Sequence, residues 1–167
     1  MTRAVLSLGA NLGDRAASLQ SAVDALGEHS RILAVSPVYQ TSPMGGPAQP
    51  DFLNAVVVVE ADDSAAALLA WCQEIELLAG RVRGERWGPR VLDIDIITFG
   101  DLASDDPTLT LPHPRASERA FVLVPWLDVD PTAQLGGSSV AELIRVVGTA
   151  GLTRRDELTL VVPSGCG

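Results

Sequence analysis

Apolar and polar positions predict alternating strands and helices in the first part of the chain. The apolar run at residues 4–8 predicts a short buried strand, and the glycine-flanked residues 9–13 predict a turn. Asp14 then suits the N-cap of a helix with apolar positions at helical spacing, and Gly27 suits its end. The apolar residues 32–35 predict a second strand.

The middle of the chain repeats this order. Residues 43–50 hold three prolines and two glycines, which predicts a loop, and the β-branched residues 53–60 predict a strand. Ser64 suits the N-cap of a second helix, Gly80 suits its end, and residues 92–99 predict another strand. The apolar stripe of this second helix consists of Leu68, Trp71, Cys72, Ile75 and Leu78.

The C-terminal third gives weaker signals. Residues 107–114 lie between prolines and predict an extended segment, and residues 117–127 predict a short helix disturbed by Pro125. Residues 140–147 predict a further helix, and residues 158–162 predict a late strand.

The resulting order of elements, β-α-β-β-α-β, predicts the fold class. It is typical of an α+β, ferredoxin-like antiparallel sheet with helices on one face, here followed by C-terminal additions. The chain shows no internal repeat and no linker, so we expect residues 1–167 to form a single domain. The tail after about residue 148 gives no functional signal.

Composition narrows the possible partners. The 167 residues are 47% hydrophobic, which indicates a globular domain, and the net charge of −9 argues against a long nucleic acid as ligand. No apolar run approaches the length that crosses a membrane or forms a signal-peptide core. Cys72 and Cys166 have no metal-binding spacing and suggest no disulfide framework. We therefore expect a monomeric cytoplasmic protein that binds neither nucleic acid nor membrane.

The basic residues are unusual in kind and in place. All twelve are arginine, and half of them fall within residues 81–119. Such a cluster in an acidic chain suggests a small polyanionic ligand, because guanidinium groups make paired contacts with phosphate oxygens. The six clustered arginines are Arg81, Arg83, Arg86, Arg90, Arg115 and Arg119.

Asp93 and Asp95 are candidate metal ligands. Side chains alternate along a strand, so both carboxylates should face one side, with their Cα atoms roughly 7 Å apart. Aspartate is depleted in strands, and a fixed pair of carboxylates suits Mg²⁺, which takes the rest of its shell from water and phosphate. The alternative is an acidic, solvent-facing side of an edge strand.

The glycine- and arginine-rich residues 80–91 directly precede this strand. Carboxylates beside an arginine array are typical of a phosphoryl-transfer site, where metal ions and arginines offset the charge of the transferred group. The glycines suit a loop that closes over the site and excludes water. Surface salt bridges between the arginines and aspartates are the alternative interpretation.

Several ordered segments resemble one family. The segment Arg-Trp-Gly-Pro-Arg-Val-Leu-Asp-Ile-Asp-Ile-Ile at residues 86–97 is similar to the signature of the 6-hydroxymethyl-7,8-dihydropterin pyrophosphokinases of folate biosynthesis. The resemblance covers roughly residues 3–145. Its other segments are residues 7–14, 39–43, 49–55, Gln73 and Glu76 with 80–83, 111–115 and 119–123.

The resemblance implies an ATP-dependent transfer of diphosphate. The pterin hydroxymethyl oxygen would attack the β-phosphorus of ATP directly, AMP would leave, and two Mg²⁺ ions would be held by Asp93 and Asp95. Arg81 and Arg90 would assist catalysis. The implied ATP-binding residues are Gln73, Glu76, Arg83, Arg86, Trp87, Ile96, Thr110, His113 and Arg119.

The resemblance also implies a pterin site. Phe52 and Phe121 would stack on either side of the pterin ring, and Asn54 would pair with its amide-like edge. The backbone around Thr41, Ser42 and Met44 would supply further hydrogen bonds.

The chain departs from the family pattern at three places. Phe52 stands where tyrosine is frequent, Thr108 stands where some members have an arginine, and the arginine loop is one residue shorter at Gly84.

Two other functions remain open from the sequence. A nucleotidyltransferase with a two-carboxylate metal site would release pyrophosphate instead of AMP. A ferredoxin-like regulatory module would bind a nucleotide without turnover, but it would leave the arginine loop and the aspartate pair without a purpose.

Overall fold

The computed structural model describes residues 1–11, 13–41, 51–79 and 92–163. Its helices are α1 (Arg15–His29), α2 (Ala65–Leu78), the 3-10 helix η1 (Ala116–Glu118), α3 (Ala120–Val129) and α4 (Val140–Val147). Its strands are β1 (Thr2–Ala10), β2 (Ser30–Val35), β3 (Tyr39–Thr41), β4 (Phe52–Ala61), β5 (Asp93–Phe99), β6 (Ser104–Asp106), β7 (Leu109–Leu111), β8 (Gln134–Leu135), β9 (Ser138–Ser139) and β10 (Leu152–Arg154).

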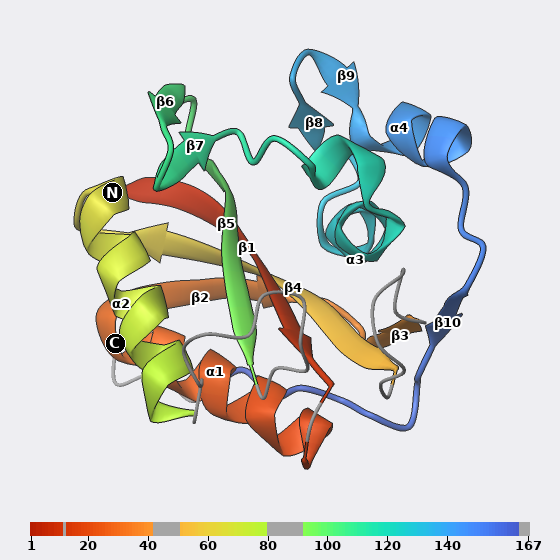
Figure 1. Ribbon diagram of the computed structural model, residues 1–167, viewed down its shortest axis with the longest axis horizontal. Helices are drawn as coiled ribbons and strands as arrows, with labels where there is room; N and C mark the ends of the chain where they lie inside the picture. Colours follow the sequence, from red (N-terminus) through yellow and green to blue (C-terminus); the bar gives the residue numbers. More distant parts are fainter. Residues whose placement is uncertain (12, 42–50, 80–91, 164–167) are drawn as a thin grey trace.

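One six-stranded sheet organises the molecule. The strand order is β10-β3-β4-β1-β5, with β2 pairing beside β3 on β4, and every pairing is antiparallel. The two long central strands, β1 and β4, pair over their whole length, from Thr2 opposite Ala61 to Ala10 opposite Leu53. Figure 1 shows α1 and α2 together on one side of this sheet. The predicted α+β class with an antiparallel sheet is confirmed.

The α1 and α2 face buries the larger core. Leu6, Leu8 and Val57 from the central strands pack with apolar residues of both helices, among them Cys72 of α2. The predicted caps are confirmed, because the side chains of Asp14 and Ser64 each accept a hydrogen bond of 3.1 Å from a backbone N–H three residues on. Helix α1 continues past Gly27 to His29, so the predicted stop at that glycine is wrong.

The additions after β5 pack on the opposite face of the sheet. Helices α3 and α4 cover Val5, Val56 and Val58, and Trp126 of α3 is buried in this second core. The helix predicted at 117–127 is divided into η1 and α3, and Pro125 lies inside α3 without ending it. Along this face of the sheet, the apolar residues of the second core are followed by polar ones, Asp93 and Asp95 on β5 and Asn54 on β4.

The C-terminal residues after α4 belong to the main sheet. Strand β10 pairs with β3, a pairing that no local pattern in the sequence predicts. The strand predicted at 158–162 is wrong: Leu158 and Leu160 alternate with exposed residues, but Val161 bonds to the side chain of Gln20 instead of a neighbouring strand. Alternation alone therefore reproduced the burial pattern of a strand without its pairing. Among the described residues, no helix is long and apolar enough to cross a membrane.

Candidate active site

Strand β5 carries the predicted metal ligands on one side only. Leu92, Ile94 and Ile96 are at most 5% exposed and pack in the core beneath α1 and α2. Asp93 and Asp95 alternate with them and are half-buried, so their carboxylates face the side on which α3 begins. The predicted alternation is confirmed, and both acids lie on one face.

A buried carboxylate from α2 braces this strand. Glu76 is 3% exposed, and its Oε2 accepts a hydrogen bond of 2.9 Å from the backbone N–H of Ile94. Strand β5 is the last strand on its side of the main sheet, so this bond uses an amide on the outer edge. Glu76 therefore fixes the backbone between the two aspartates, a contact that the sequence alone did not indicate.

Arg119 connects the aspartates to α3. Its Nη1 lies 3.8 Å from Asp95 Oδ2, and its Cζ lies 5.6 Å from the centre of the Phe121 ring. Both partners of the ion pair keep about a third of their side-chain surface exposed (28% and 34%), so the pair is partly screened by water. The arrangement places a cation and an aromatic ring beside the carboxylates.

His113 lies close to the same group of charges. Its backbone N–H donates to the carbonyl of Ile97 at 2.9 Å, and its Nδ1 accepts from the backbone N–H of Arg115 at 3.2 Å. Burial lowers the pKa of this imidazole, and the charges of Arg119 and Arg115 lower it further, against an opposing effect of Asp93. A neutral ring with Nδ1 occupied as an acceptor carries its proton on Nε2, where it can donate to an anionic ligand.

The titration of His113 should reflect this environment. We expect the midpoint for the His113 ring in an NMR titration to lie below the ordinary 6.5. In the Arg119→Gln variant the midpoint should move up, because one neighbouring cation is gone, and should stay below 6.5, because the ring remains buried. A His113 midpoint at or above 6.5 in the unaltered protein would contradict the proposed effect of burial and of the neighbouring arginines on its pKa.

A second polar group lies on the same face, toward β3. Asn54 of β4 is 3% exposed, and its Nδ2 donates to Thr41 Oγ1 at 2.8 Å. Phe52, two residues earlier on the same side of the strand, is half-buried. The structure thus brings together three of the residues predicted for the pterin site.

Gly9 separates the two groups, and it lies inside β1 instead of starting the turn predicted at residues 9–13. In the sheet it lies opposite Asp93 on one side and Asn54 on the other, which makes a row across β5, β1 and β4. A Cβ at Gly9 would lie 3.1 Å from Asn54 Oδ1 and 3.7 Å from Phe52 Cδ1. The missing side chain leaves room above the sheet between the carboxylates and the amide, which stand two strand spacings, about 10 Å, apart.

The remaining predicted residues are less closely grouped. Gln73 is exposed on α2, and Thr110 of β7 donates from its hydroxyl to the carbonyl of Asp106. The side chain of Ile96 lies in the core, which leaves its main chain as the part that could meet a ligand. Thr108, a departure from the family pattern, bonds to Asp106 on the exposed hairpin. The predicted site residues that lie outside the described part of the chain are Ser42, Met44, Arg81, Arg83, Arg86, Trp87 and Arg90.

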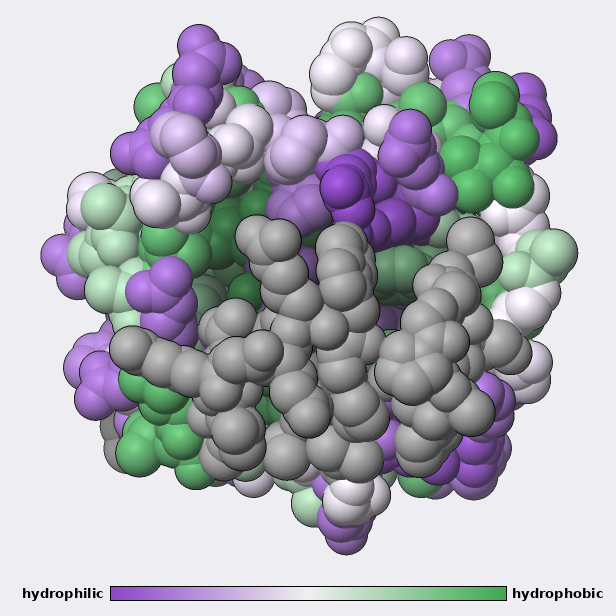
Figure 2. Space-filling view, viewed as in Figure 1, coloured by the Kyte–Doolittle hydropathy of each residue, from purple (hydrophilic) through white to green (hydrophobic). Residues whose placement is uncertain are grey.

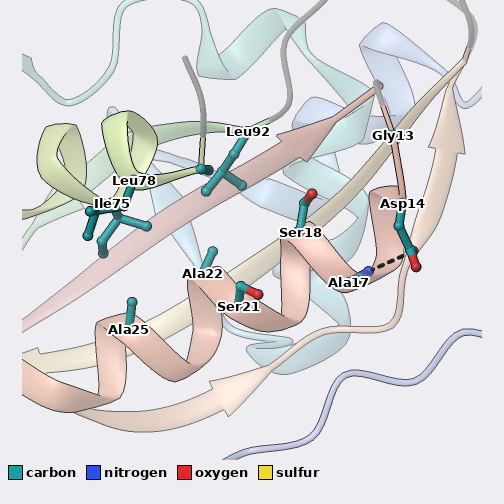
Figure 3. A pocket seen from close by; sticks show the side chains of 11 residues that line it. Gly13, Asp14, Ala17, Ser18, Ser21, Ala22, Ala25, Ile75, Leu78 and Leu92 are labelled. Carbon is teal, nitrogen blue, oxygen red and sulfur yellow. Dashed lines mark hydrogen bonds between the residues drawn. The ribbon is translucent and has the colours of Figure 1, made fainter.

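Two features of the surface bear on where a charged ligand binds. Figure 2 shows hydrophilic residues gathered between the β6–β7 hairpin and α3. A separate cavity of about 330 Å³ lies between α1 and the end of α2, next to Leu92. Figure 3 shows small side chains such as Ser18, Ser21 and Ala22 around it, and the described residues that line it include no basic side chain. The described part of its lining therefore offers no cation to a polyphosphate, whereas the face with Asp93 and Asp95 carries Arg119.

Solved structures share the fold. A crystal structure of Plasmodium falciparum HPPK-DHPS superposes with a TM-score of 0.73 at 15% identity, and the alignment covers 92% of this chain. This chain spans 48% of that longer protein, about half its length. At this identity the similarity supports the fold alone.

Sequence relatives agree over nearly the whole chain. Proteins of Mycobacterium tuberculosis and Mycobacterium leprae, both named 2-amino-4-hydroxy-6-hydroxymethyldihydropteridine pyrophosphokinase, are 45% and 50% identical to it. The first alignment covers 98% of this chain and 92% of the relative, and the second covers 96% and 89%. The family model for 7,8-dihydro-6-hydroxymethylpterin-pyrophosphokinase (HPPK) matches residues 5–131. The chain therefore belongs to the 7,8-dihydro-6-hydroxymethylpterin-pyrophosphokinase family.

Proposed function

We propose that this protein transfers diphosphate from ATP to the hydroxymethyl group of 6-hydroxymethyl-7,8-dihydropterin and releases AMP. Its family makes it a pyrophosphokinase of folate biosynthesis that uses ATP as co-substrate. The observation that carries the detailed proposal is the row from Asp93 through Gly9 to Asn54. It has an anionic end suited to metal-bound phosphate and an amide end suited to a heterocycle, with no side chain at Gly9 between them.

We assign the metal-binding role to Asp93 and Asp95. Two half-buried carboxylates on one face fit Mg²⁺, which keeps several waters and takes substrate phosphate oxygens as ligands. Within the described residues, no group of three or more His, Cys, Asp or Glu side chains could hold a metal ion, so the two aspartates are the proposed protein ligands. Two Mg²⁺ ions held there would supply positive charge that offsets the charge of the transferred group.

The protein's own groups orient and offset the charge of ATP. Arg119 is near Asp95 and can approach a phosphate oxygen, and the neutral His113 can donate from Nε2 without adding charge. We propose that Arg81 and Arg90 assist transfer, as the family resemblance implies. The other proposed ATP-binding residues are Gln73, Glu76, Arg83, Arg86, Trp87, Ile96 and Thr110.

The reaction needs no covalent intermediate with the protein. The hydroxymethyl oxygen forms the new bond to the β-phosphorus, while the bond from that phosphorus to the oxygen of AMP breaks. Positioning and electrostatic stabilisation are then the main tasks of the site. The proton of the hydroxyl group is lost to solvent or to phosphate, so no side chain has to act as a strong base.

We place the dihydropterin at the amide end of the row. Phe52 and Phe121 would stack on its two faces, and Asn54 would pair with its amide-like edge. Thr41, Ser42 and Met44 would contribute from the adjoining segment. We also propose that residues 1–167 act as one domain and that the enzyme is a cytoplasmic monomer.

Gly9 gives a direct test of this placement. The Gly9→Ala variant should bind dihydropterin about tenfold more weakly, because a methyl group 3.1 Å from Asn54 Oδ1 forces the amide or the ligand to shift. Affinity for a non-hydrolysable ATP analogue should change little. Isothermal titration with each ligand measures both effects, and an unchanged dihydropterin affinity would argue against a ring above Gly9.

Product analysis tests the reaction itself. The protein is incubated with ATP, Mg²⁺ and 6-hydroxymethyl-7,8-dihydropterin, and the nucleotide products are separated, with an EDTA-treated sample as control. We expect AMP to appear in step with the dihydropterin diphosphate. Release of pyrophosphate would favour a nucleotidyltransferase, and binding without turnover would favour a regulatory module.

A further inference from the structure

The C-terminal segment from β10 to Pro163 runs across the molecule as a strap. Leu152–Arg154 pairs with Tyr39–Thr41 of β3, and the chain then continues to α1. There, the backbone N–H and C=O of Val161 both bond to the side chain of Gln20 at 2.8 Å. Figure 1 shows this segment passing from the β3 edge of the sheet to the side of α1. The strap therefore connects β3, with which its first residues pair, to the first helix, α1.

The strap is anchored in the core as well. Leu158 and Leu160 are half-buried against the larger core. Pro163 lies close to α1, because a Cβ built on Gly27 would be only 3.0 Å from Pro163 Cγ. These apolar contacts and the paired bonds to Gln20 fix the far end of the strap. Because the strap is fixed at its far end, its paired residues at the other end can limit movement of β3.

Arg155 connects the strap to β3 and to the residue before it through hydrogen bonds. Its backbone N–H donates to the carbonyl of Val38 at 2.9 Å, and its guanidinium donates to Gln40 Oε1. Gln40 Nε2 in turn donates to Asp51 Oδ2 at 2.7 Å. Arg15 of α1 completes the chain of bonds, because its Nη1 donates to the carbonyl of Asp51 at 2.7 Å. Strap, β3, the start of β4 and α1 are thus joined through side chains.

The other side of β3 belongs to the proposed pterin site. Side chains alternate along the strand, so Gln40 points toward the strap while Tyr39 and Thr41 point to the α3 side. Thr41 accepts the bond from Asn54 Nδ2, and the Tyr39 hydroxyl donates to Asp128 of α3. Burial and the Asp128 carboxylate raise the pKa of Tyr39 to about 12, so the phenol remains a donor at neutral pH.

Thr41 decides how the amide of Asn54 is turned. Because Nδ2 is directed to Thr41, Oδ1 faces the space above Gly9 and is available as an acceptor. A ligand that pairs there must present N–H donors, as the amino and ring N–H groups of a pterin do. Strand β3 pairs with β4 over only three residues, so its position depends on what supports its other side.

We propose that the strap positions Thr41, and through it Asn54, for recognition of the pterin edge, with Arg155 as the positioning residue that connects them. This inference rests on the proposed function. It assigns the C-terminal segment a role in affinity for the pterin and none in the transfer of diphosphate, because Arg155 and Val161 bond to β3, the residue before it and α1.

The Arg155→Ala variant tests this role. We expect its KM for dihydropterin to rise about tenfold, as for loss of a charge-assisted hydrogen bond that orders a binding group, while KM for ATP and kcat at saturation change less than about twofold. Arg155→Lys should recover part of the affinity. Arg145→Ala, which removes an exposed arginine of α4, is the matched control and should leave all three constants unchanged.

A double variant separates positioning from general destabilisation. If Arg155 acts through Gln40, the Gln40→Ala and Arg155→Ala changes together should raise KM for dihydropterin no more than Arg155→Ala alone. Independent, additive effects would contradict the proposed connection. Suppose that the unaltered enzyme turns over normally and that KM for dihydropterin is unchanged in both single variants. That result would refute the positioning role of the strap and leave the proposed function intact. An unaltered enzyme that binds no dihydropterin would overturn the proposed function and this inference with it.

Discussion

Replacing Asp95 with asparagine should lower kcat by about three orders of magnitude, equivalent to roughly 4 kcal/mol of transition-state stabilisation. Asparagine keeps the size of the side chain but removes the negative charge that holds a divalent cation against the phosphates. Asp95 also faces Arg119 at 3.8 Å, so the change leaves that cation with less compensation beside the bound nucleotide. Turnover is measured at saturating ATP, Mg²⁺ and dihydropterin.

A matched acid and a folding measurement make the Asp95 result specific. Asp105→Asn on the exposed β6–β7 hairpin removes the same charge away from the row and should leave kcat unchanged. The Asp95→Asn protein should keep its thermal midpoint within a few degrees, because the side chain is half-buried and outside both apolar cores. Turnover within about tenfold of the unaltered enzyme would refute the assignment of Asp95 as a metal ligand.

Truncating Phe121 should weaken dihydropterin binding by about 1–3 kcal/mol, or roughly 5- to 150-fold in Kd. The ring is half-buried in the first turn of α3 and lies against the Arg119 guanidinium. Alanine removes one of the two aromatic faces proposed to hold the flat heterocycle, and it removes the ring beside Arg119 as well. Equilibrium titration followed by dihydropterin fluorescence gives the change in Kd.

The substitution of Phe121 has a conservative counterpart. Phe121→Tyr keeps an aromatic face and should bind dihydropterin within about threefold of the unaltered protein, since stacking depends on the ring. Affinity of the alanine variant for a non-hydrolysable ATP analogue should fall much less than its affinity for dihydropterin. If Kd for dihydropterin is the same with alanine and phenylalanine, the aromatic sandwich is wrong.

In the first hundred residues, four strands of the sheet and its two helices could be predicted because local signals there agree with the global fold, whereas the three-residue strand β3 was not predicted. Asp14 and Ser64 cap helices as expected, and the β-branched residues of β4 form a central strand. The C-terminal segment was harder because its contacts are not local. β10 pairs with β3 more than a hundred residues away, and Leu158 and Leu160 alternate like a strand while packing beside α1.

The site shows the same division between local and non-local information. The alternation of Asp93 and Asp95 follows from strand geometry and could be predicted. The bond from Glu76 to the Ile94 amide, and the position of Gly9 between Asp93 and Asn54, depend on which elements become neighbours. A strand register is needed to see why a glycine at that point leaves room for a ligand.

The number of bound metal ions shows whether Asp93 and Asp95 form the proposed metal site. Mn²⁺ serves as a spectroscopic substitute for Mg²⁺, and its binding is titrated by electron paramagnetic resonance with a saturating non-hydrolysable ATP analogue. We expect two tightly bound Mn²⁺ ions per chain in the unaltered protein and loss of tight binding when Asp93 and Asp95 are both asparagine. The same Mn²⁺ affinity and stoichiometry in both proteins would contradict the proposed metal site.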